Sequence, residues 1–118
     1  RAPLSSDMLT VYVGYVGERV VGYAVFDTHV VRTLPETFLV VLSPEGVVDA
    51  TYLLAFHEPV EYAPSDAWLK QFIGKERPEQ SRLGRTVAGI TGATLSADAV
   101  TKGVRRVFAI YTVLLRDL

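Results

Sequence analysis

The run Thr91-Gly92-Ala93-Thr94-Leu95-Ser96 precedes the longest periodic pattern in this chain, and the two together decide how the domain is built. The run holds three hydroxyl side chains in six residues, and only small residues separate its two threonines. Backbone N–H groups at the start of a helix lack intrahelical partners and carry partial positive charge. A helix that begins directly after this run therefore offers a binding place for a phosphate.

Apolar residues recur from Ala97 onward at the three- and four-residue spacing of one helical face. This stripe comprises Val100, Val104, Val107, Phe108, Tyr111, Leu114 and Leu115. The lysine and arginine residues of the same segment fall on other faces. The pattern predicts an amphipathic helix of about 20 residues, about 30 Å long, from Ala97 to Leu118. We expect Ser96 to cap this helix and Asp98 to lie in its first turn, near the positive end.

The first half of the chain is rich in valine and tyrosine, residue types that favour strands. Four strands are predicted, at residues 9–16, 20–26, 38–42 and 47–56. Gly17-Glu18-Arg19 separates the first pair and Ser43-Pro44-Glu45-Gly46 the second, so two β-hairpins are predicted. Gly14 and Gly22 inside the strands indicate bulges or close approach of another group to the backbone. The connection from His29 to Glu36 has no clear pattern.

A short helix from Asp66 to about Ile73 is predicted after the second hairpin, with Ser65 as its cap and Gly74 as its end. Its expected apolar face is Trp68, Leu69, Phe72 and Ile73. Residues 75–82 predict an exposed loop, and residues 86–90 a short fifth strand. The fold class is therefore α+β, with an antiparallel sheet of hairpins packed against a long C-terminal helix and one short helix.

Composition limits the functions that the chain can have. With 118 residues, 49% of them hydrophobic and 21% charged, the sequence is that of one globular domain over residues 1–118. The net charge of −1 gives no electrostatic basis for binding nucleic acid. The absence of cysteine excludes disulfides, thiolate metal sites and iron–sulfur clusters. The apolar run from Val107 to Leu115 is far shorter than the ~20 residues that a membrane-spanning helix needs.

The run Ile90-Thr91-Gly92-Ala93-Thr94-Leu95-Ser96 resembles the Ser/Thr-Gly-Ala-Thr signature of the FMN-binding domain family. This family includes the flavin-carrying C subunit of the sodium-translocating quinone reductase and the G subunit of Rnf complexes. The last threonine of the signature carries FMN through a phosphoester bond in these proteins, which implies covalent FMN at Thr94 here. The segment from Trp68 to Gly74 and the hairpin-rich first half are also similar to the family. Without the resemblance, Thr94 would be an ordinary loop threonine ahead of a helix.

The residue types of the run suit this chemistry. The hydroxyl that becomes an FMN phosphoester attacks the pyrophosphate of FAD, so the acceptor must be serine or threonine. The acceptor must also enter the active site of a flavin transferase, and its small neighbours allow this. The bound phosphate keeps a negative charge, which a helix N-terminus favours by about 0.3–1 kcal/mol. The candidate cofactor-binding residues are Thr91, Gly92, Ala93, Thr94, Leu95 and Ser96.

One position departs from the family pattern. The family usually has an aspartate six residues before the flavin-bearing threonine, as part of what the transferase recognises, and here this position is Ala88. The departure leaves the fold assignment intact and bears on how efficiently the flavin is attached. Arg82 and Arg85, just upstream of the signature, are candidates for neutralising the phosphate, although solvated loop arginines are the commoner outcome.

The segment from His57 to Tyr62 combines acidic and aromatic side chains. Its Glu58-Pro59 pair is similar to a family loop that lies beside the flavin ring, so Glu58 and Tyr62 are further candidate FMN contacts. An ordinary surface loop is the alternative. No metal site is predicted, because Pro59 prevents the helix of a His-Glu-x-x-His motif and the second histidine is missing.

The leading functional hypothesis is an electron-transfer domain that carries FMN covalently. We expect a redox carrier rather than a stand-alone enzyme, since no acid–base or nucleophile–base pair is evident and FMN supplies the chemistry. The family implies an extracytoplasmic location, periplasmic or on the outer face of the membrane. It also implies a flavin transferase, and redox proteins or quinone-linked membrane subunits, as partners.

The chain begins at Arg1 rather than methionine, so we expect a fragment of a longer, membrane-anchored or secreted protein whose anchor lies outside this sequence. Two alternatives to the leading hypothesis stay open. One is a flavin-free sensory or docking module of the same fold, which Ala88 favours. The other is a small oxidoreductase that binds FMN non-covalently, although nothing in the sequence resembles a nicotinamide site.

Overall fold

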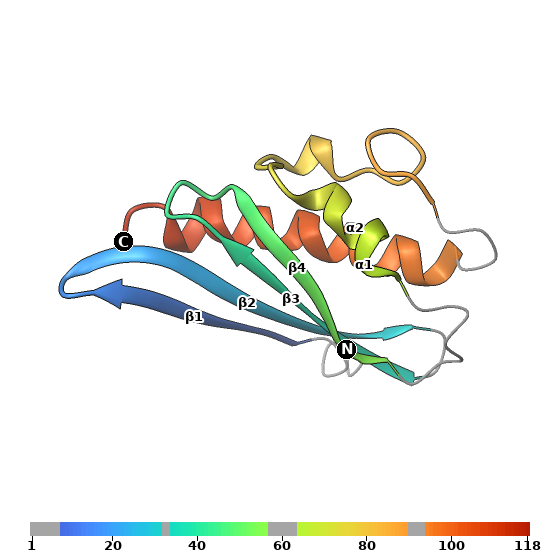
Figure 1. The fold of residues 1–118 in the computed structure, drawn as a ribbon, viewed down its shortest axis with the longest axis horizontal. Helices are drawn as coiled ribbons and strands as arrows, with labels where there is room; N and C mark the ends of the chain where they lie inside the picture. Colours follow the sequence, from blue (N-terminus) through green and yellow to red (C-terminus); the bar gives the residue numbers. More distant parts are fainter. Residues whose placement is uncertain (1–7, 32–33, 57–63, 90–93) are drawn as a thin grey trace.

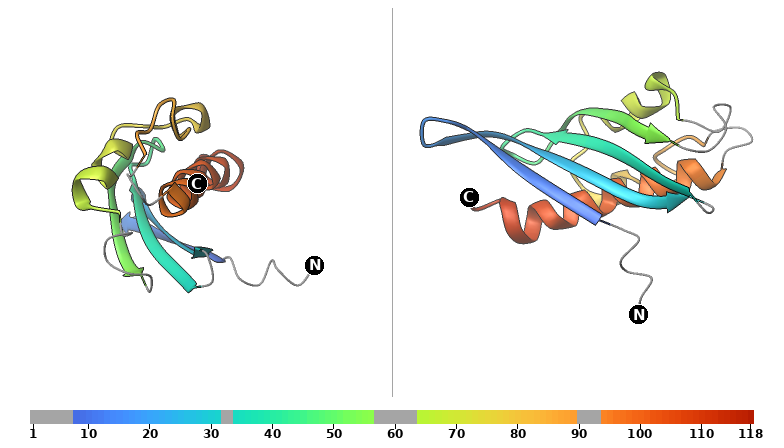
Figure 2. Two further views of the ribbon diagram at one scale, coloured as in Figure 1. Left: turned by 90° about the vertical axis from the view of Figure 1, so that its right-hand side faces the viewer. Right: turned by 90° about the horizontal axis from the view of Figure 1, so that it is seen from below.

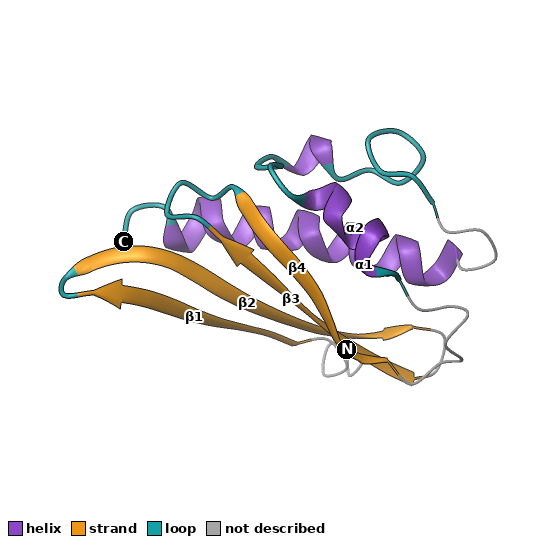
Figure 3. Ribbon diagram, in the orientation of Figure 1, coloured by secondary structure: helices purple, strands orange, loops and turns teal. Residues whose placement is uncertain are grey.

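Four antiparallel strands, neighbours in chain order, form the sheet on which the rest of the chain packs. They are β1 (Met8–Val16), β2 (Arg19–Val31), β3 (Leu34–Leu42) and β4 (Val48–Phe56). The long helix α2 (Thr94–Ile110) crosses one face of this sheet, and the short helix α1 (Asp66–Leu69) lies beside β4 (Figures 1 and 2). The structure is a computed structural model that describes residues 8–31, 34–56, 64–89 and 94–118. Its α+β architecture confirms the predicted fold class (Figure 3).

Both predicted hairpins are present, but the two central strands are longer than expected. β2 runs to Val31 and β3 begins at Leu34, so most of the unclear connection from His29 to Glu36 is strand, with these two residues paired. Polar residues in this stretch concealed its strand pattern. The hydroxyls of Thr28 and Thr37 lie 2.9 Å apart across the pair. Cross-strand pairing of this kind overrides a weak local signal.

The glycine pair in the first hairpin forms the predicted bulge. Gly14 pairs with Gly22, whereas the next residue, Tyr15, pairs with Val20, so Val21 is the extra residue. A Cβ atom on Gly22 would lie 2.9 Å from the carbonyl oxygen of Leu42 in the neighbouring strand. Gly22 therefore serves both of the expected purposes, since it borders a bulge and lets another strand approach its backbone.

The short helix begins where the sequence predicts, at Asp66, but as an α-helix it ends at Leu69, earlier than the predicted end near Ile73. The hydroxyl of Ser65 accepts a hydrogen bond from the Trp68 N–H at 3.0 Å and caps α1. After α1 the chain continues as a 3-10 turn over Lys70–Phe72. Gly74, with φ of 87°, ends the helical segment in the left-handed region that glycine favours.

Two expectations in this region are wrong. Ile73 does not join the apolar face with Trp68, Leu69 and Phe72, because the backbone turns extended at this residue and leaves its side chain 48% exposed. Residues 86–89 do not form a strand, and Ile90 lies outside the described residues. The Val87 N–H donates to the Arg82 carbonyl at 3.1 Å, so a local turn uses the backbone group that a strand would need.

The long helix begins three residues earlier than predicted, at Thr94. Ser96 therefore lies inside the helix, and the expectation that it caps the helix is wrong. Asp98 falls in the second turn, where its carboxylate lies 2.9 Å from the Lys102 ammonium group, one helical turn away. The predicted core positions of α2 are correct as far as Phe108. Val100, Val104, Val107 and Phe108 are all buried.

The last turn of this helix is wider than an α-helical turn. Tyr111–Leu115 is a π-helical segment, in which the Arg116 N–H donates to the Tyr111 carbonyl at 2.8 Å. A π turn holds more residues than an α turn, so the position that returns to the core shifts by one. Leu115 is consequently buried, whereas Leu114, predicted to be in the stripe, is 63% exposed.

α2 lies in close contact with the sheet at Gly103. A Cβ atom there would collide with the Asp27 carboxylate and would lie 2.7 Å from the ring of Phe38. Asp27 and Phe38 are cross-strand partners in β2 and β3. The buried Asp27 carboxylate also accepts hydrogen bonds from Arg106 Nη2, at 2.9 and 3.2 Å. Glycine at position 103 therefore allows the helix to reach a contact that no larger residue would permit.

Two tyrosines fasten the C-terminal end of α2. The Tyr23 hydroxyl donates to the Leu115 carbonyl at 2.9 Å, and the Tyr111 hydroxyl donates to the Pro44 carbonyl at 2.6 Å. The two rings pack edge to face with centroids 5.7 Å apart. Burial raises the pKa of both phenols, and the neighbouring Tyr15 adds to the rise in the pKa of Tyr23.

We predict that Gly103→Ala destabilises the domain, although the same change at an exposed helical position stabilises by about 1 kcal/mol. The added methyl group must displace the ring of Phe38 or the carboxylate of Asp27. Such overpacking typically costs about 1–3 kcal/mol. Lys102→Ala, at the adjacent exposed position, is the matched control. Urea unfolding measures the free energy of unfolding of both variants. A Gly103→Ala domain as stable as wild type would show that the space between α2 and the sheet can hold an added methyl group.

We also predict that the tyrosine contacts weaken at high pH. Because the pKa of each phenol is raised in the folded state, their contribution is complete below the ordinary value near 10.0 and is lost as pH rises through the raised values. Unfolding measured from pH 7 to pH 11 should therefore show a steeper loss in wild type than in a Tyr23→Phe, Tyr111→Phe double variant. Tyr52→Phe, at an exposed tyrosine, is the control and should follow wild type. Parallel curves for wild type and the double variant would contradict the prediction.

Candidate functional site

Four elements meet at one end of the molecule. β2 ends at Val31, β3 begins at Leu34, β4 ends at Phe56 and α2 begins at Thr94. The views in Figures 1 and 2 agree that these four ends lie together, away from the tip of the β1–β2 hairpin. The residue that the sequence marks as the flavin acceptor therefore lies where the sheet ends and the long helix starts.

The predicted cofactor-binding residues fall into two groups. Thr94, Leu95 and Ser96 form the first turn of α2. The remaining five lie outside the described residues, so their roles stay predictions. They are Thr91, Gly92, Ala93, Glu58 and Tyr62.

The start of α2 suits a phosphate bonded to Thr94. Since the helix begins at this residue, the hydroxyl-bearing residue and the N–H groups without intrahelical partners belong to the same turn. The 17-residue length of α2 gives this end the partial positive charge of a long helix. Asp98 is one turn further on and pairs with Lys102, so it does not compete directly for this end. The donor groups present therefore fit a phosphate ester.

The segment upstream of Thr94 is tied to α2 from the side. The Ser81 hydroxyl donates to the Thr101 carbonyl at 2.8 Å, and the Arg105 guanidinium donates to the Ser81 carbonyl at 2.6 Å. Ser81 is completely buried, so the prediction of an exposed loop over residues 75–82 is wrong at this residue. A serine near the end of a polar loop carries no sequence signal for such a contact, because its partners lie 20 or more residues away.

The next residues form a closed turn. The Arg82 carbonyl accepts from the N–H groups of Arg85, Thr86 and Val87, at 3.0 to 3.1 Å. The Thr86 hydroxyl accepts in return from the Arg82 N–H at 3.0 Å. Val87 is buried in the core, whereas Arg82 and Arg85 are exposed. Their suggested role as phosphate partners stays a prediction.

Ala88 is held by two side chains from the α1 region. Trp68 Nε1 donates to the Ala88 carbonyl at 2.6 Å, and the Ala88 N–H donates to Gln71 Oε1 at 2.8 Å. The Ala88 side chain is exposed, so the position that departs from the family pattern faces solvent. Trp68 was expected in the core and is buried there, but its hydrogen bond and the role of Gln71 were not predicted. The three-residue spacing of Trp68 and Gln71 on one helical face is the signal that could have indicated a shared target.

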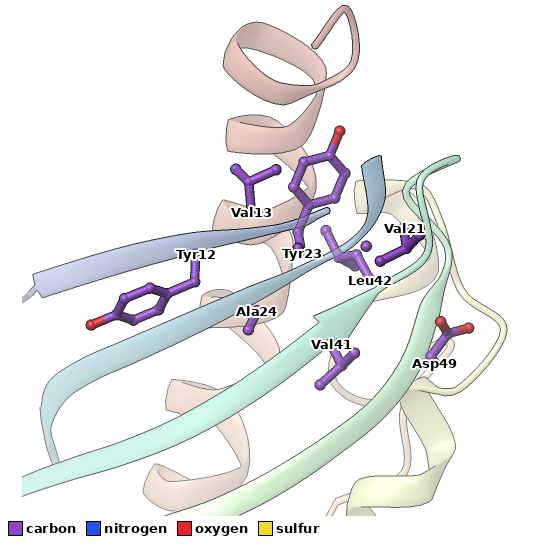
Figure 4. Close-up of a pocket in the computed structure, with 10 residues that line it drawn as sticks. Tyr12, Val13, Val21, Tyr23, Ala24, Val41, Leu42 and Asp49 are labelled. Carbon is purple, nitrogen blue, oxygen red and sulfur yellow. The ribbon is translucent and has the colours of Figure 1, made fainter. Parts of the chain in front are cut away.

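Two of the hollows lined by described residues contain none of the predicted site residues. The larger, about 280 Å³, lies where Gly14 and Gly22 leave the sheet without side chains, at the end near the C-terminus of α2 (Figure 4). Its lining comes mostly from the first three strands, with Asp49 of β4 at its rim. The second, about 200 Å³, lies between β4 and α1. Both are smaller than the ~300–1,000 Å³ typical of ligand clefts.

Two other kinds of feature are absent from residues 8–31, 34–56, 64–89 and 94–118. No group of three or more histidine, aspartate or glutamate residues in these ranges is arranged to hold a metal ion. No helix in the same ranges has both the length and the apolar character needed to cross a membrane.

Comparison with models of protein families matches residues 6–109 of this chain to the FMN-binding domain. The matched range includes both hairpins, α1 and all but the last residue of α2. It therefore extends far beyond the short run on which the sequence resemblance was based. A search of curated proteins found no match.

Proposed function

The chain belongs to the FMN-binding domain family, and on that premise we propose that it is an electron-transfer domain carrying FMN through a phosphoester on Thr94. Family membership supports FMN as the cofactor. One observation carries the covalent part of the proposal, namely that α2 begins at the very residue that the signature marks as acceptor. A phosphate attached there lies, by connectivity alone, at the positive end of a long helix.

The proposed attachment is a group transfer from FAD. The Thr94 hydroxyl oxygen forms a bond to the phosphorus of the FMN half, and the bond from that phosphorus to the bridging pyrophosphate oxygen breaks. AMP leaves, and the hydroxyl proton is released. The chain thereby gains the mass of one FMN less one water. A flavin transferase is the partner that this step requires.

Once attached, FMN supplies one- and two-electron chemistry, while the chain holds it and tunes its potential. The N–H groups in the first turn of α2 stabilise the negative phosphate. We propose that Glu58 and Tyr62 lie near the flavin ring. Both residues lie outside the described ranges, so the family resemblance alone supports this part of the proposal.

The proposed setting is extracytoplasmic, periplasmic or on the outer face of the cell membrane, where flavin attachment of this type occurs in the family. The electron donor and acceptor would be redox proteins or quinone-linked membrane subunits. The family resemblance supports this setting and these partners.

The second candidate function is a flavin-free sensory or docking module of the same fold. The observation that favours it is the exposed Ala88 side chain, since an exposed position is one that a transferase can contact. A transferase that reads an aspartate there would find no carboxylate. A domain that binds FMN without a covalent bond is the third candidate, and it predicts flavin that denaturation releases.

We predict that Thr94→Ala abolishes covalent FMN, because it removes the oxygen atom that forms the ester. Thr94→Ser should retain a fraction, since the nucleophilic atom survives. Intact-mass analysis after co-expression with a flavin transferase measures both, with peptide mapping to locate the modification. Thr112→Ala, at an exposed threonine on the far end of the same helical segment, is the matched control and should be fully modified. Wild type that gains no mass, under conditions that modify a known family member, would contradict the covalent proposal.

We predict further that Ala88→Asp raises the initial rate of flavin attachment by restoring the carboxylate that the family presents. The change should leave stability within about 0.5 kcal/mol of wild type, because the side chain is exposed and both hydrogen bonds of Ala88 come from its backbone. Ala88→Asn has nearly the same shape without the charge and is the control. Equal rates for wild type and Ala88→Asp would show that the aspartate is not what limits attachment in this chain.

A further inference from the structure

We propose that Trp68 and Gln71 act together as positioning residues for flavin attachment. In this inference, which rests on the proposed function, the two side chains form a clamp on the backbone of Ala88. The clamp fixes the start of the chain segment that leads to Thr94. It therefore presents both position 88 and the acceptor threonine to the transferase in a defined arrangement.

The geometry of the clamp is specific to one residue. Trp68 Nε1 holds the Ala88 carbonyl at 2.6 Å, and Gln71 Oε1 holds the Ala88 N–H at 2.8 Å. Both backbone polar groups of Ala88 are therefore used, as they would be in a strand pair, although the partners are side chains. The Ala88 side chain stays exposed, so the clamp leaves it accessible to a second protein.

The clamp is itself held in place. Gln71 Nε2 donates to the Trp68 carbonyl at 3.1 Å, which turns Gln71 Oε1 toward Ala88. The Trp68 ring packs edge to face on Phe72, with centroids 5.4 Å apart. The Thr51 hydroxyl donates to the Leu69 carbonyl at 2.7 Å and fastens α1 to β4. These contacts fix the position of Ala88 relative to the sheet.

The clamp matters for attachment because only residues 89–93 separate Ala88 from Thr94, the first residue of α2. A transferase that reads position 88 needs this residue in one arrangement while the Thr94 hydroxyl reacts. Ordering one additional residue corresponds to about a five- to thirtyfold loss of rate. A segment already fixed at Ala88 avoids that loss, whereas a segment released from the clamp incurs it.

The test compares four variants for the initial rate of FMN attachment, measured by intact mass with FAD and a flavin transferase. Gln71→Ala removes the acceptor oxygen, and Trp68→Phe removes the N–H donor while keeping an aromatic ring on Phe72. Both should attach FMN at least about fivefold more slowly than wild type. Gln71→Glu keeps an acceptor oxygen for Ala88 but loses the Nε2 donor to the Trp68 carbonyl, so it should recover part of the rate. Lys70→Ala, at the exposed neighbouring position, is the control and should match wild type.

A second readout needs no flavin. Hydrogen exchange of the Ala88 amide should be faster in Gln71→Ala than in wild type and Lys70→Ala, because its acceptor is gone.

Slow attachment with unchanged exchange would overturn the positioning role, since Gln71 would then act by touching the transferase. Wild-type rates in Gln71→Ala and Trp68→Phe would overturn the clamp and leave the proposed function standing. Wild type that takes no FMN would overturn both. Recovery of rate in Gln71→Glu separates loss of the bond from general loss of folding.

Discussion

The close approach of α2 to the sheet at Gly103 is the constraint on which the position of the long helix depends. Gly103 sets the depth of the helix, because Phe38 and Asp27 fill the space that a side chain would take. Arg106, three residues further on, binds the same buried carboxylate and sets the rotation of the helix. The Asp27 side chain is buried, whereas Arg106 is 42% exposed, so the pair orients the helix while one of its charges stays in contact with water. Since α2 is continuous, these contacts also fix Thr94, nine residues and about 13 Å along the axis from Gly103.

The region around the proposed acceptor is supported from two directions. On the helix side, Ser81 and Arg105 join the upstream segment to α2. On the sheet side, the clamp of Trp68 and Gln71 joins the same segment to α1 and, through it, to β4. The proposed site thus combines an irregular approach segment with firm attachment to both layers of the fold. Such an arrangement suits a residue that must enter another enzyme and afterwards hold a cofactor at a constant position.

Periodicity and turn chemistry were sufficient to predict both hairpins, the Ser65 cap and the core stripe of the long helix. What they missed depends on contacts between distant residues. The Asp27–Arg106 pair joins residues 79 positions apart, and the bonds to Ala88 span 17 and 20 positions, so no local pattern encodes them.

The true start of α2 at Thr94 was missed for a different reason. Serine before an apolar stripe resembles a cap, and nothing in the sequence distinguishes a cap from a serine within the first turn. Thr94 was proposed as the acceptor only through a family signature, because composition and spacing do not separate an acceptor from any other threonine ahead of a helix.

Ala88 is hydrogen-bonded to the α1 region, and α2 begins at Thr94. The number of residues that bridge these two points is therefore restricted during evolution. Each inserted residue would add up to about 3.3–3.6 Å of slack between the two points, and each deletion would remove as much reach. By contrast, the tip of the first hairpin at Gly17 and Glu18 is exposed and joins only two neighbouring strands, so a longer loop there would alter nothing beyond its own ends. Length differences among members of this fold should therefore gather at the hairpin tip, while the bridge before α2 keeps its residue count.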